Sequence, residues 1–298
     1  MTILVPTDFS ACSEVALRQA MAFARRDGGT LHIVHVMPSF ENNPYIPMQS
    51  GEWGAFFVQQ EENARDLLEE WIGKFDTEGL DVERHLPLGA AAAPAILGLA
   101  EEIGAELIVV GAYGRRGFRR LFFGSVTQEI VRHAECAVLT VRESAEPIIK
   151  EWPDRILVPV DLSAPCEHAL KAVPTMAGPG TRIDLVHVID LLNTLPVAAG
   201  AVGLSFPEAR ANADGAVRRF IAETDGGPDL DAGHVTFEII EGRPAEALAE
   251  YAAERGVDLL VIATHGLSGL NRLLLGSVTE RLLRQVDCPV LTLRADTA

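Results

Sequence analysis

A glycine-rich segment at residues 107–142 contains the side chains and backbone groups best suited to binding an anion. From Gly111 to Ser125 it reads Gly-x-x-Gly, nine further residues and Gly-Ser. Glycine lets the backbone approach a ligand closely because it has no Cβ atom. Ser125 and Thr127 stand where a helix is expected to begin, and a helix N-terminus offers unpaired N–H groups to an anion. The pattern favours a phosphate site; the alternative is that these residues only form turns and cap a helix.

Residues 259–294 repeat this pattern in the other half of the chain. The nine-residue gap between Gly266 and Gly276 is kept, but Ala263 replaces the first glycine. Its extra methyl group matters only where the residue needs a positive φ or a close ligand approach. Because the pattern recurs in two otherwise diverged halves, turn formation alone is the weaker explanation.

The whole chain reads as an internal duplication. Asp8 recurs 153 residues later as Asp161, and His35 has its counterpart 152 residues later. A period of this length is too long for a solenoid repeat and fits two tandem copies of one domain. We therefore expect domains at 1–146 and 147–298.

Each half is expected to alternate strands and helices. The predicted strands of the first half are 3–8, 31–37, 82–88, 106–111 and 137–142, and its predicted helices are 11–27, 53–75, 94–103 and 125–134. The second half repeats the order, with strands at 155–161, 182–189, 234–241, 258–263 and 289–294 and helices at 166–177, 207–224, 244–255 and 277–286. Mostly apolar strands alternating with helices predict an α/β fold, with a parallel sheet covered on both faces.

Asp8 ends the first predicted strand of the chain. Ligands of open α/β sheets bind beyond the carboxyl ends of the strands. If the first and fourth strands are neighbours, Asp8 and the turn at Gly111 face the same crevice. Asp8 could then bind sugar hydroxyls or adenine, or hold a metal against phosphates. The alternative is that Asp8 caps the following helix, but Ser10 is available for that role, which favours ligand contact.

The charge of the chain restricts its partners. A formal net charge of −17 argues against nucleic acid and anionic membranes. It also repels a nucleotide at long range, so a phosphate site must act through backbone N–H groups and nearby arginines. Arg115, Arg116, Arg119 and Arg120 are candidates in the first half, with a solvated loop as the equal alternative, whereas Arg272 alone remains in the second.

The composition predicts a cytoplasmic protein. No run of about 18 apolar residues, as a membrane span requires, is present. The first residues lack the basic and apolar regions of a signal peptide. The four cysteines have no CxxC spacing, which suits free thiols in a reducing compartment.

These motifs, taken together, resemble the universal stress protein family in its tandem two-domain form, over nearly the whole chain. The motifs are VPTD (5–8) and VPVD (158–161), HVM (35–37) and HVI (187–189), and the two glycine blocks, each followed by Cys-x-Val-Leu-Thr. The resemblance implies two doubly wound domains, each with a five-stranded parallel sheet of order 3-2-1-4-5. In the nucleotide-binding branch of the family it also implies ATP, with or without magnesium, between the first strand and the glycine-rich loop.

The resemblance assigns site residues by position in both halves. In the first domain these are Pro6, Thr7, Asp8 and Val36 around adenine and ribose, and Val110, Gly111, Gly114, Gly124, Ser125, Val126 and Thr127 around ribose and phosphates. In the second domain they are Pro159, Val160, Asp161, Val188, Ile262, Ala263, Gly266, Gly276, Ser277, Val278 and Thr279.

Other polar residues of the motifs have less specific interpretations. His35 and His187 are expected to be core histidines held by hydrogen bonds, because they lack partners at metal-ligand spacing. Tyr113 and His265 occupy the same place in the two glycine turns, where they either line a pocket or shield it.

The resulting hypothesis is a stress-response protein that binds ATP and acts as a nucleotide-dependent sensor or adaptor for an unknown protein partner. The first alternative is an interaction protein with empty sites; the second is a slow ATPase or nucleotide-dependent transferase. No catalytic residue is predicted, since the P-loop lysine and the HExxH motif are absent from the sequence.

The last strand of each half is expected to form an interface. The segments AVLTV (137–141) and PVLTL (289–293) are apolar, and an apolar edge strand favours pairing with another edge. The resemblance implies that such strands pair across domains. We therefore expect the two halves to pair in this way, and tandem chains to form a homodimer.

Overall fold

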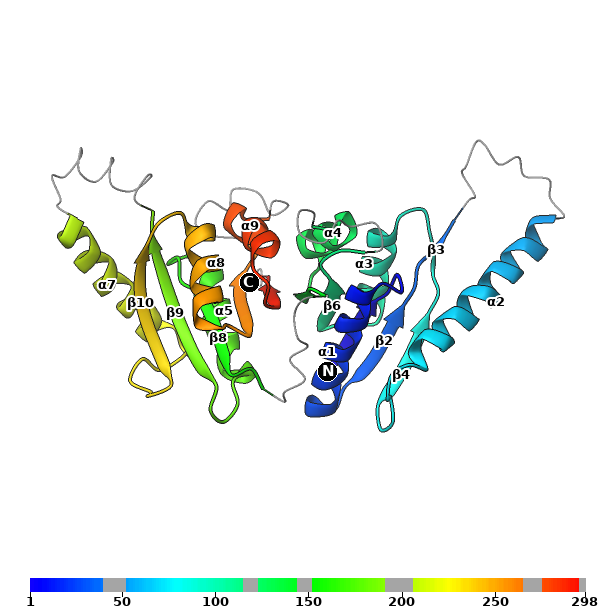
Figure 1. Cartoon of the computed structure of the whole chain (residues 1–298), viewed down its shortest axis with the longest axis horizontal. Helices are drawn as coiled ribbons and strands as arrows, with labels where there is room; N and C mark the ends of the chain where they lie inside the picture. Colours follow the sequence, from blue (N-terminus) through cyan, green and yellow to red (C-terminus); the bar gives the residue numbers. More distant parts are fainter. Residues whose placement is uncertain (40–51, 115–122, 144–151, 191–205, 265–274, 295–298) are drawn as a thin grey trace.

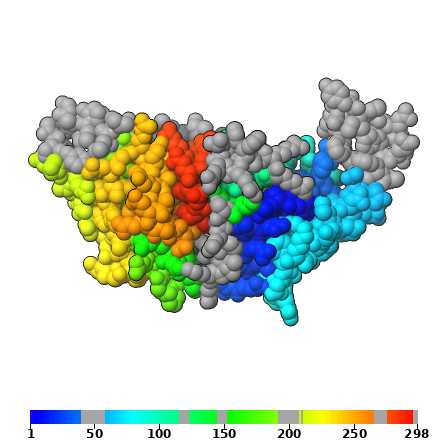
Figure 2. All heavy atoms as spheres, viewed as in Figure 1, coloured from blue at the N-terminus to red at the C-terminus, as the bar shows by residue number. Residues whose placement is uncertain are grey.

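The computed structural model describes residues 1–39, 52–114, 123–143, 152–190, 206–264 and 275–294. One ten-stranded sheet runs through both halves of the chain. Figure 1 shows its outer strands, β10 (Val235–Glu241) and β4 (Asp81–His85), towards opposite ends of the molecule. The halves lie side by side along the long axis of the molecule (Figure 2). No helix in the described ranges has the length and apolar character needed to cross a membrane.

The first half contains β1 (Thr2–Pro6), α1 (Ala11–Asp27), β2 (Thr30–Val34), β3 (Met37–Pro38), α2 (Glu52–Ile72), β4 (Asp81–His85), β5 (Leu88–Gly89), α3 (Ala92–Glu102), β6 (Leu107–Gly111), α4 (Ser125–His133) and β7 (Ala137–Val141). The second half contains β8 (Arg155–Pro159), α5 (Ala164–Met176), β9 (Arg182–Ile189), α7 (Phe206–Glu223), β10 (Val235–Glu241), α8 (Pro244–Arg255), β11 (Leu259–Ala263), α9 (Ser277–Gln285) and β12 (Val290–Leu293).

The strand order of each half confirms the predicted fold class. The sheet runs β10-β9-β8-β11-β12-β7-β6-β1-β2-β4. With the short β3 and β5 set aside, each half has the order 3-2-1-4-5, and its strands are parallel. β1 pairs with β6. Strands β2 and β4 are added on one side of this pair and β7 on the other, so the direction in which strands are added reverses here. That is where open α/β sheets bind ligands.

Two predicted strands are shorter than expected, and this is a correction. The segments 31–37 and 82–88 were each expected to be continuous, but β2 ends at Val34 and β4 ends at His85. The separate β3 and β5 pair with each other in a small second sheet. Pro87 accounts for the break, because proline has no N–H group with which to continue a strand ladder.

Helices cover both faces of the sheet because successive strand residues point to opposite sides. In β1, Ile3 belongs to a buried cluster with Leu17 of α1 and Trp71 of α2. Leu4 belongs to a second cluster, on the other face, with Ile96 of α3 and Ile130 of α4. The second half repeats this arrangement, with α5 and α7 in the first cluster and α8 and α9 in the second.

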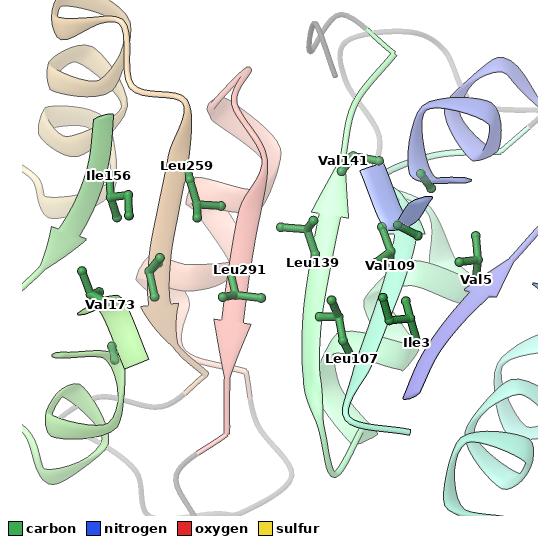
Figure 3. Close-up of a cluster of buried hydrophobic side chains, with 14 of the residues drawn as sticks. Ile3, Val5, Leu107, Val109, Leu139, Val141, Ile156, Val173, Leu259 and Leu291 are labelled. Atoms are coloured by element: carbon green, nitrogen blue, oxygen red, sulfur yellow. The ribbon is translucent and has the colours of Figure 1, made fainter. Parts of the chain in front are cut away.

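The two halves are joined through β7 and β12, which confirms the expected pairing of the last strands. These strands are antiparallel, with Leu139 opposite Leu291, and Figure 3 shows both side chains in the buried cluster. The hydroxyl of Thr292 donates a 3.1 Å hydrogen bond to the carbonyl oxygen of Val138. Arg142 donates across the same junction to the carbonyl oxygen of Leu283 at 2.9 Å. The result is one continuous sheet with an internal pseudo-dimer.

Candidate functional site

A cavity of about 640 Å³ opens at the carboxyl ends of β1 and β6. This volume lies within the range of small-molecule sites, about 300–1,000 Å³. All eleven site residues predicted for the first domain line the cavity: Pro6, Thr7, Asp8, Val36, Val110, Gly111, Gly114, Gly124, Ser125, Val126 and Thr127. Residues more than 100 positions apart in the sequence therefore share one site.

The end of β1 presents the Asp8 carboxylate to this cavity. Ser10 is the N-cap of α1, because its side chain accepts a hydrogen bond from the Ser13 N–H group. The Ser10 N–H group in turn donates to Asp8 Oδ1 at 3.1 Å. The helix cap is therefore Ser10, as the sequence favoured, and Asp8 is positioned by the turn beside it.

Phe9 adopts a strained backbone conformation directly after Asp8. Its φ angle is +63°, and Leu162 at the equivalent place in the second domain has a φ angle of +62°. A positive φ is uncommon for large side chains, and such strain is concentrated at functional sites. The turn sends the chain from β1 into α1 while Asp8 and Phe9 both line the cavity.

His35 lines the cavity instead of lying in the core. It follows the end of β2 and is half-buried. Its Nδ1 donates a 2.9 Å hydrogen bond to the carbonyl oxygen of Thr7, and its ring centroid lies 4.4 Å from that of Phe9. His187 repeats the hydrogen bond, with Nδ1 2.7 Å from the carbonyl oxygen of Val160. The expected hydrogen bonds are confirmed, whereas the core location is wrong for His35.

The two glycines that flank the turn are closely packed against other parts of the protein. A Cβ atom on Gly111 would come 2.9 Å from Cys12 Sγ, so glycine lets α1 approach β6. A Cβ atom on Gly124 would lie 3.2 Å from the carbonyl oxygen of Ala112. In the first domain Cys12 stands two residues after the N-cap Ser10. In the second domain Pro165 stands two residues after the N-cap Ser163, at the equivalent position. Pro165 thus holds the position equivalent to Cys12, and Ala263 the position equivalent to Gly111.

The N-terminus of α4 faces the cavity with its first turn. Gly124 is the N-cap residue and supplies no side-chain hydrogen bond. Ser125 and Val126 are exposed, whereas Thr127 is buried and donates a 2.7 Å hydrogen bond to the carbonyl oxygen of Gly111. This bond fixes the start of α4 against the end of β6. The first-turn N–H groups and the positive end of the helix dipole are suited to binding an anion.

Ten cavity residues were not among the predicted site residues: Phe9, Ser10, Ser13, Val34, His35, Leu67, Ala92, Ile96, Tyr113 and Phe123. Tyr113 and His35 had been considered, with their roles left open or assigned to the core. Burial raises the pKa of Tyr113 above its usual value, so its phenol group stays protonated and can donate a hydrogen bond. Leu67, Ala92 and Ile96 come from α2 and α3, and only the fold brings them to this place.

The second domain repeats the framework of the site. Thr279 donates to the carbonyl oxygen of Ala263 at 3.1 Å, as Thr127 does to Gly111. Asp161 follows β8 as Asp8 follows β1, but its Oδ1 accepts from both the N–H and the hydroxyl group of Ser163, at 3.0 and 2.5 Å. The other predicted residues lie at the corresponding ends: Pro159, Val160, Val188, Ile262, Gly276, Ser277 and Val278.

Several predicted residues lie outside the part of the chain that the structure describes. These are Gly266, His265, Arg272 and the arginines Arg115, Arg116, Arg119 and Arg120. Their expected roles stay predictions.

Comparison with known proteins identifies relatives over the whole chain. A model of the universal stress protein family matches residues 1–142 and again residues 153–294. A universal stress protein of Mycobacterium tuberculosis is 26% identical over 98% of this chain and 96% of its own length. A putative universal stress protein of Staphylococcus aureus is 34% identical over 49% of this chain and 86% of its own length.

A solved structure supports the fold. A universal stress protein from Archaeoglobus fulgidus superposes with a TM-score of 0.68, over 99% of this chain and 98% of its own, at 19% identity. Because the identity is low, this likeness bears on the fold alone. It agrees with two tandem domains of the same architecture.

Proposed function

The chain belongs to the universal stress protein family, and we propose that its first domain binds ATP and that the protein acts as a nucleotide-dependent sensor or adaptor in the cytoplasm. One observation carries the proposal. A cavity of about 640 Å³ combines the Asp8 carboxylate, an apolar wall and the uncapped N-terminus of α4.

The chemistry of the cavity suits the three parts of a nucleotide. Val36, Val110 and Ile96 supply apolar surface for the faces of an adenine ring. Asp8 supplies carboxylate oxygens, which accept hydrogen bonds from ribose hydroxyls or an adenine amino group. Ser125 and the first turn of α4 supply N–H and hydroxyl donors for phosphate. These groups lie around a single space, so one ligand can contact them all.

The acidic character of the chain limits how the phosphates are held. With a formal net charge of −17, long-range attraction cannot deliver a triphosphate to the site. Binding must come from short-range contacts, to which backbone N–H groups contribute without adding charge. Magnesium would reduce the charge of the triphosphate, so we expect it to strengthen binding.

The first test is to denature freshly purified protein and to identify and count the nucleotide released per chain. About one ATP per chain supports a filled first domain, and about two support filling of both domains. The protein is then stripped of nucleotide and titrated calorimetrically with ATP, with and without magnesium. No released nucleotide and no binding of added ATP would contradict the proposal and favour an interaction protein with empty sites.

A pair of equivalent variants assigns the occupied domain. Asp8→Ala removes the carboxylate of the first site, and Asp161→Ala makes the same change at the second. If only the first site fills, Asp8→Ala weakens ATP binding roughly ten- to a hundredfold, the loss of one charged hydrogen bond, and Asp161→Ala leaves the affinity unchanged. Phosphate release from bound ATP, measured in the same samples, tests the slow ATPase alternative.

A further inference from the structure

Two histidines and a glutamate converge at the outer edge of the first domain, and none of the three lines the nucleotide cavity. His32 lies in β2, and Glu83 and His85 lie in the edge strand β4. The register pairs His32 with Glu83 and Val34 with His85. Residues that are paired, or two positions apart, project from the same face of a sheet. The three side chains therefore share the face that carries α3. Figure 1 shows β2 and β4, the strands that carry them, on the outer side of this half.

The donor atoms of these side chains form a compact triangle. His32 Nδ1 lies 3.0 Å from His85 Nε2, and Glu83 Oε2 lies 3.4 Å from the first and 3.9 Å from the second. In a tetrahedral zinc site with bonds of about 2.0–2.1 Å, neighbouring donor atoms are separated by about 3.3 Å. The three distances approach this value without any rearrangement of the backbone.

We propose that His32, Glu83 and His85 form a zinc-binding site. Two imidazole nitrogens and one carboxylate oxygen are ligands that suit zinc, and three protein ligands leave a fourth position for water. His32 is only 8% exposed, which holds one ligand rigidly. The Glu83 side chain is 56% exposed, which gives the ion access from solvent.

At the equivalent place in the second domain, side chains of the protein alone balance the charges. By register, Asp184, Thr236 and Glu238 stand there in β9 and β10 where His32, Glu83 and His85 stand in β2 and β4. Two arginines neutralise the carboxylates: Arg155 contacts Asp184 at 2.9 Å, and Arg255 contacts Glu238 at 2.9 Å.

The first domain replaces both of these arginines with uncharged residues. Thr2 corresponds to Arg155, because the N–H group of each donates to an acidic residue just before the fourth strand of its domain, Glu106 or Asp258. Ile103 corresponds to Arg255, because each directly precedes a glycine of positive φ, Gly104 or Gly256. The protein cations of the second domain thus have no counterpart at these two positions, and His32 and His85 replace the carboxylates of Asp184 and Glu238. Glu83 is left as the one carboxylate of the cluster, beside two imidazoles that can bind a metal cation.

Metal binding here would replace the contact between the two histidine nitrogens with two bonds to the ion. In the metal-free chain the 3.0 Å separation of the two facing nitrogens is that of a hydrogen bond carrying one proton. Zinc needs both nitrogens as lone-pair donors. The hydrogen bond between the two rings is therefore given up when zinc binds.

The test is a calorimetric titration of the untagged, chelator-treated, nucleotide-free chain with zinc chloride. Cobalt(II) serves as a second probe, because its visible absorption reports tetrahedral coordination. We expect one zinc per chain, a tetrahedral cobalt spectrum and a higher thermal unfolding temperature with zinc, since a ligand bound only by the folded state stabilises it.

Three variants show whether these residues are the ligands. Loss of a direct ligand, in His85→Gln or Glu83→Gln, should weaken zinc binding at least about tenfold, since even outer-shell changes have effects of this size. Both residues are at least partly exposed, so both variants should fold. His168→Gln changes a histidine of α5 that lies outside the cluster and should bind zinc as the unchanged chain does.

Two results would overturn the proposal. One is the absence of both zinc binding and a cobalt spectrum in the unchanged chain. The other is equal zinc affinity in the unchanged chain, in His85→Gln and in Glu83→Gln, which would place the ion elsewhere. Because nucleotide is absent throughout, the result does not depend on the ATP proposal.

Discussion

The carboxylate of Asp8 lies directly beside the α-carbon of Gly114, in the space that a β-carbon on residue 114 would occupy. The end of β1 and the turn after β6 therefore touch across the cavity. Glycine at this position leaves room for the acidic side chain opposite it. Any larger residue must displace Asp8.

We predict that Gly114→Val lowers the affinity for ATP without unfolding the chain. Displacing the carboxylate removes a charged hydrogen bond to the ligand, which contributes about 1.5–3 kcal/mol, or roughly ten- to a hundredfold in affinity. Calorimetric titration with ATP measures the change. Gly98→Ala is the matched control, because a Cβ atom on this glycine of α3 meets open space. An unchanged ATP affinity in folded Gly114→Val would contradict the proposal that the Asp8 carboxylate binds the nucleotide.

Truncation at the junction should destabilise the protein strongly. Leu139 is 1% exposed and faces Leu291 across the two halves. Leu139→Ala is expected to cost about 2–5 kcal/mol, because it removes buried contacts and leaves a cavity. Urea unfolding followed by circular dichroism measures the loss. Val58→Ala in α2 is the control, since Val58 is 57% exposed; equal losses in the two variants would mean that the junction is not tightly packed.

The buried ion pair of the second domain should be more important than an exposed one. Asp184 is 2% exposed, contacts Arg155 at 2.9 Å and accepts a 2.7 Å hydrogen bond from Thr236. Removing one partner of such a pair costs about 3–5 kcal/mol, so Asp184→Ala should lower the urea midpoint clearly. Asp214→Ala breaks an exposed pair with Arg218 and should cost no more than about 0.5 kcal/mol. Similar midpoints for both variants would contradict this prediction.

The four cysteines should react slowly while the chain is folded. They are free thiols, and burial raises the pKa of Cys136 to about 11 and that of both Cys166 and Cys288 to about 12. Since unfolded thiols have a pKa of about 8.5, alkylation of these three thiols at pH 8 should be at least about a hundredfold slower in native protein than in urea. Mass spectrometry counts the modified residues; rapid native alkylation of Cys288 would refute the prediction.

The same shifts have a consequence for stability. A pKa that is higher in the folded state favours folding while the thiol is protonated. This contribution is complete below the unfolded-state pKa of about 8.5 and is lost as the pH rises towards the folded-state values. The urea midpoint should therefore begin to fall above about pH 8.5. A midpoint that rose with pH in this range would reverse the expected sign.

Sequence patterns predicted the regular elements well where local signals are strong. The helix expected at 11–27 is observed as Ala11–Asp27, with Ser10 as its cap and Gly28 in the left-handed conformation after it. The fourth strand and the start of α4 were also placed within one residue, because glycines mark their ends. The clustering of the first-domain site residues followed from the adjacency of β1 and β6, which the family resemblance implied.

Features that depend on register and packing could not be read from the sequence. The His32, Glu83 and His85 cluster exists only because β2 and β4 align these residues, and a shift of one position would place them on opposite faces. The role of Gly111 as a contact for α1 depends on how that helix packs on β6. Ile96 joins the cavity because α3 covers that face of the sheet, which residue spacing does not reveal.

The pairing of β7 with β12 also affects how the protein behaves on dilution. Separate domains joined by such an edge would come apart at low concentration. Here both strands belong to one polypeptide, so the contact persists however dilute the protein becomes. The same contact occupies the apolar edge that each domain would otherwise offer to a second chain. A homodimer of tandem chains, if it forms, must therefore assemble through another surface.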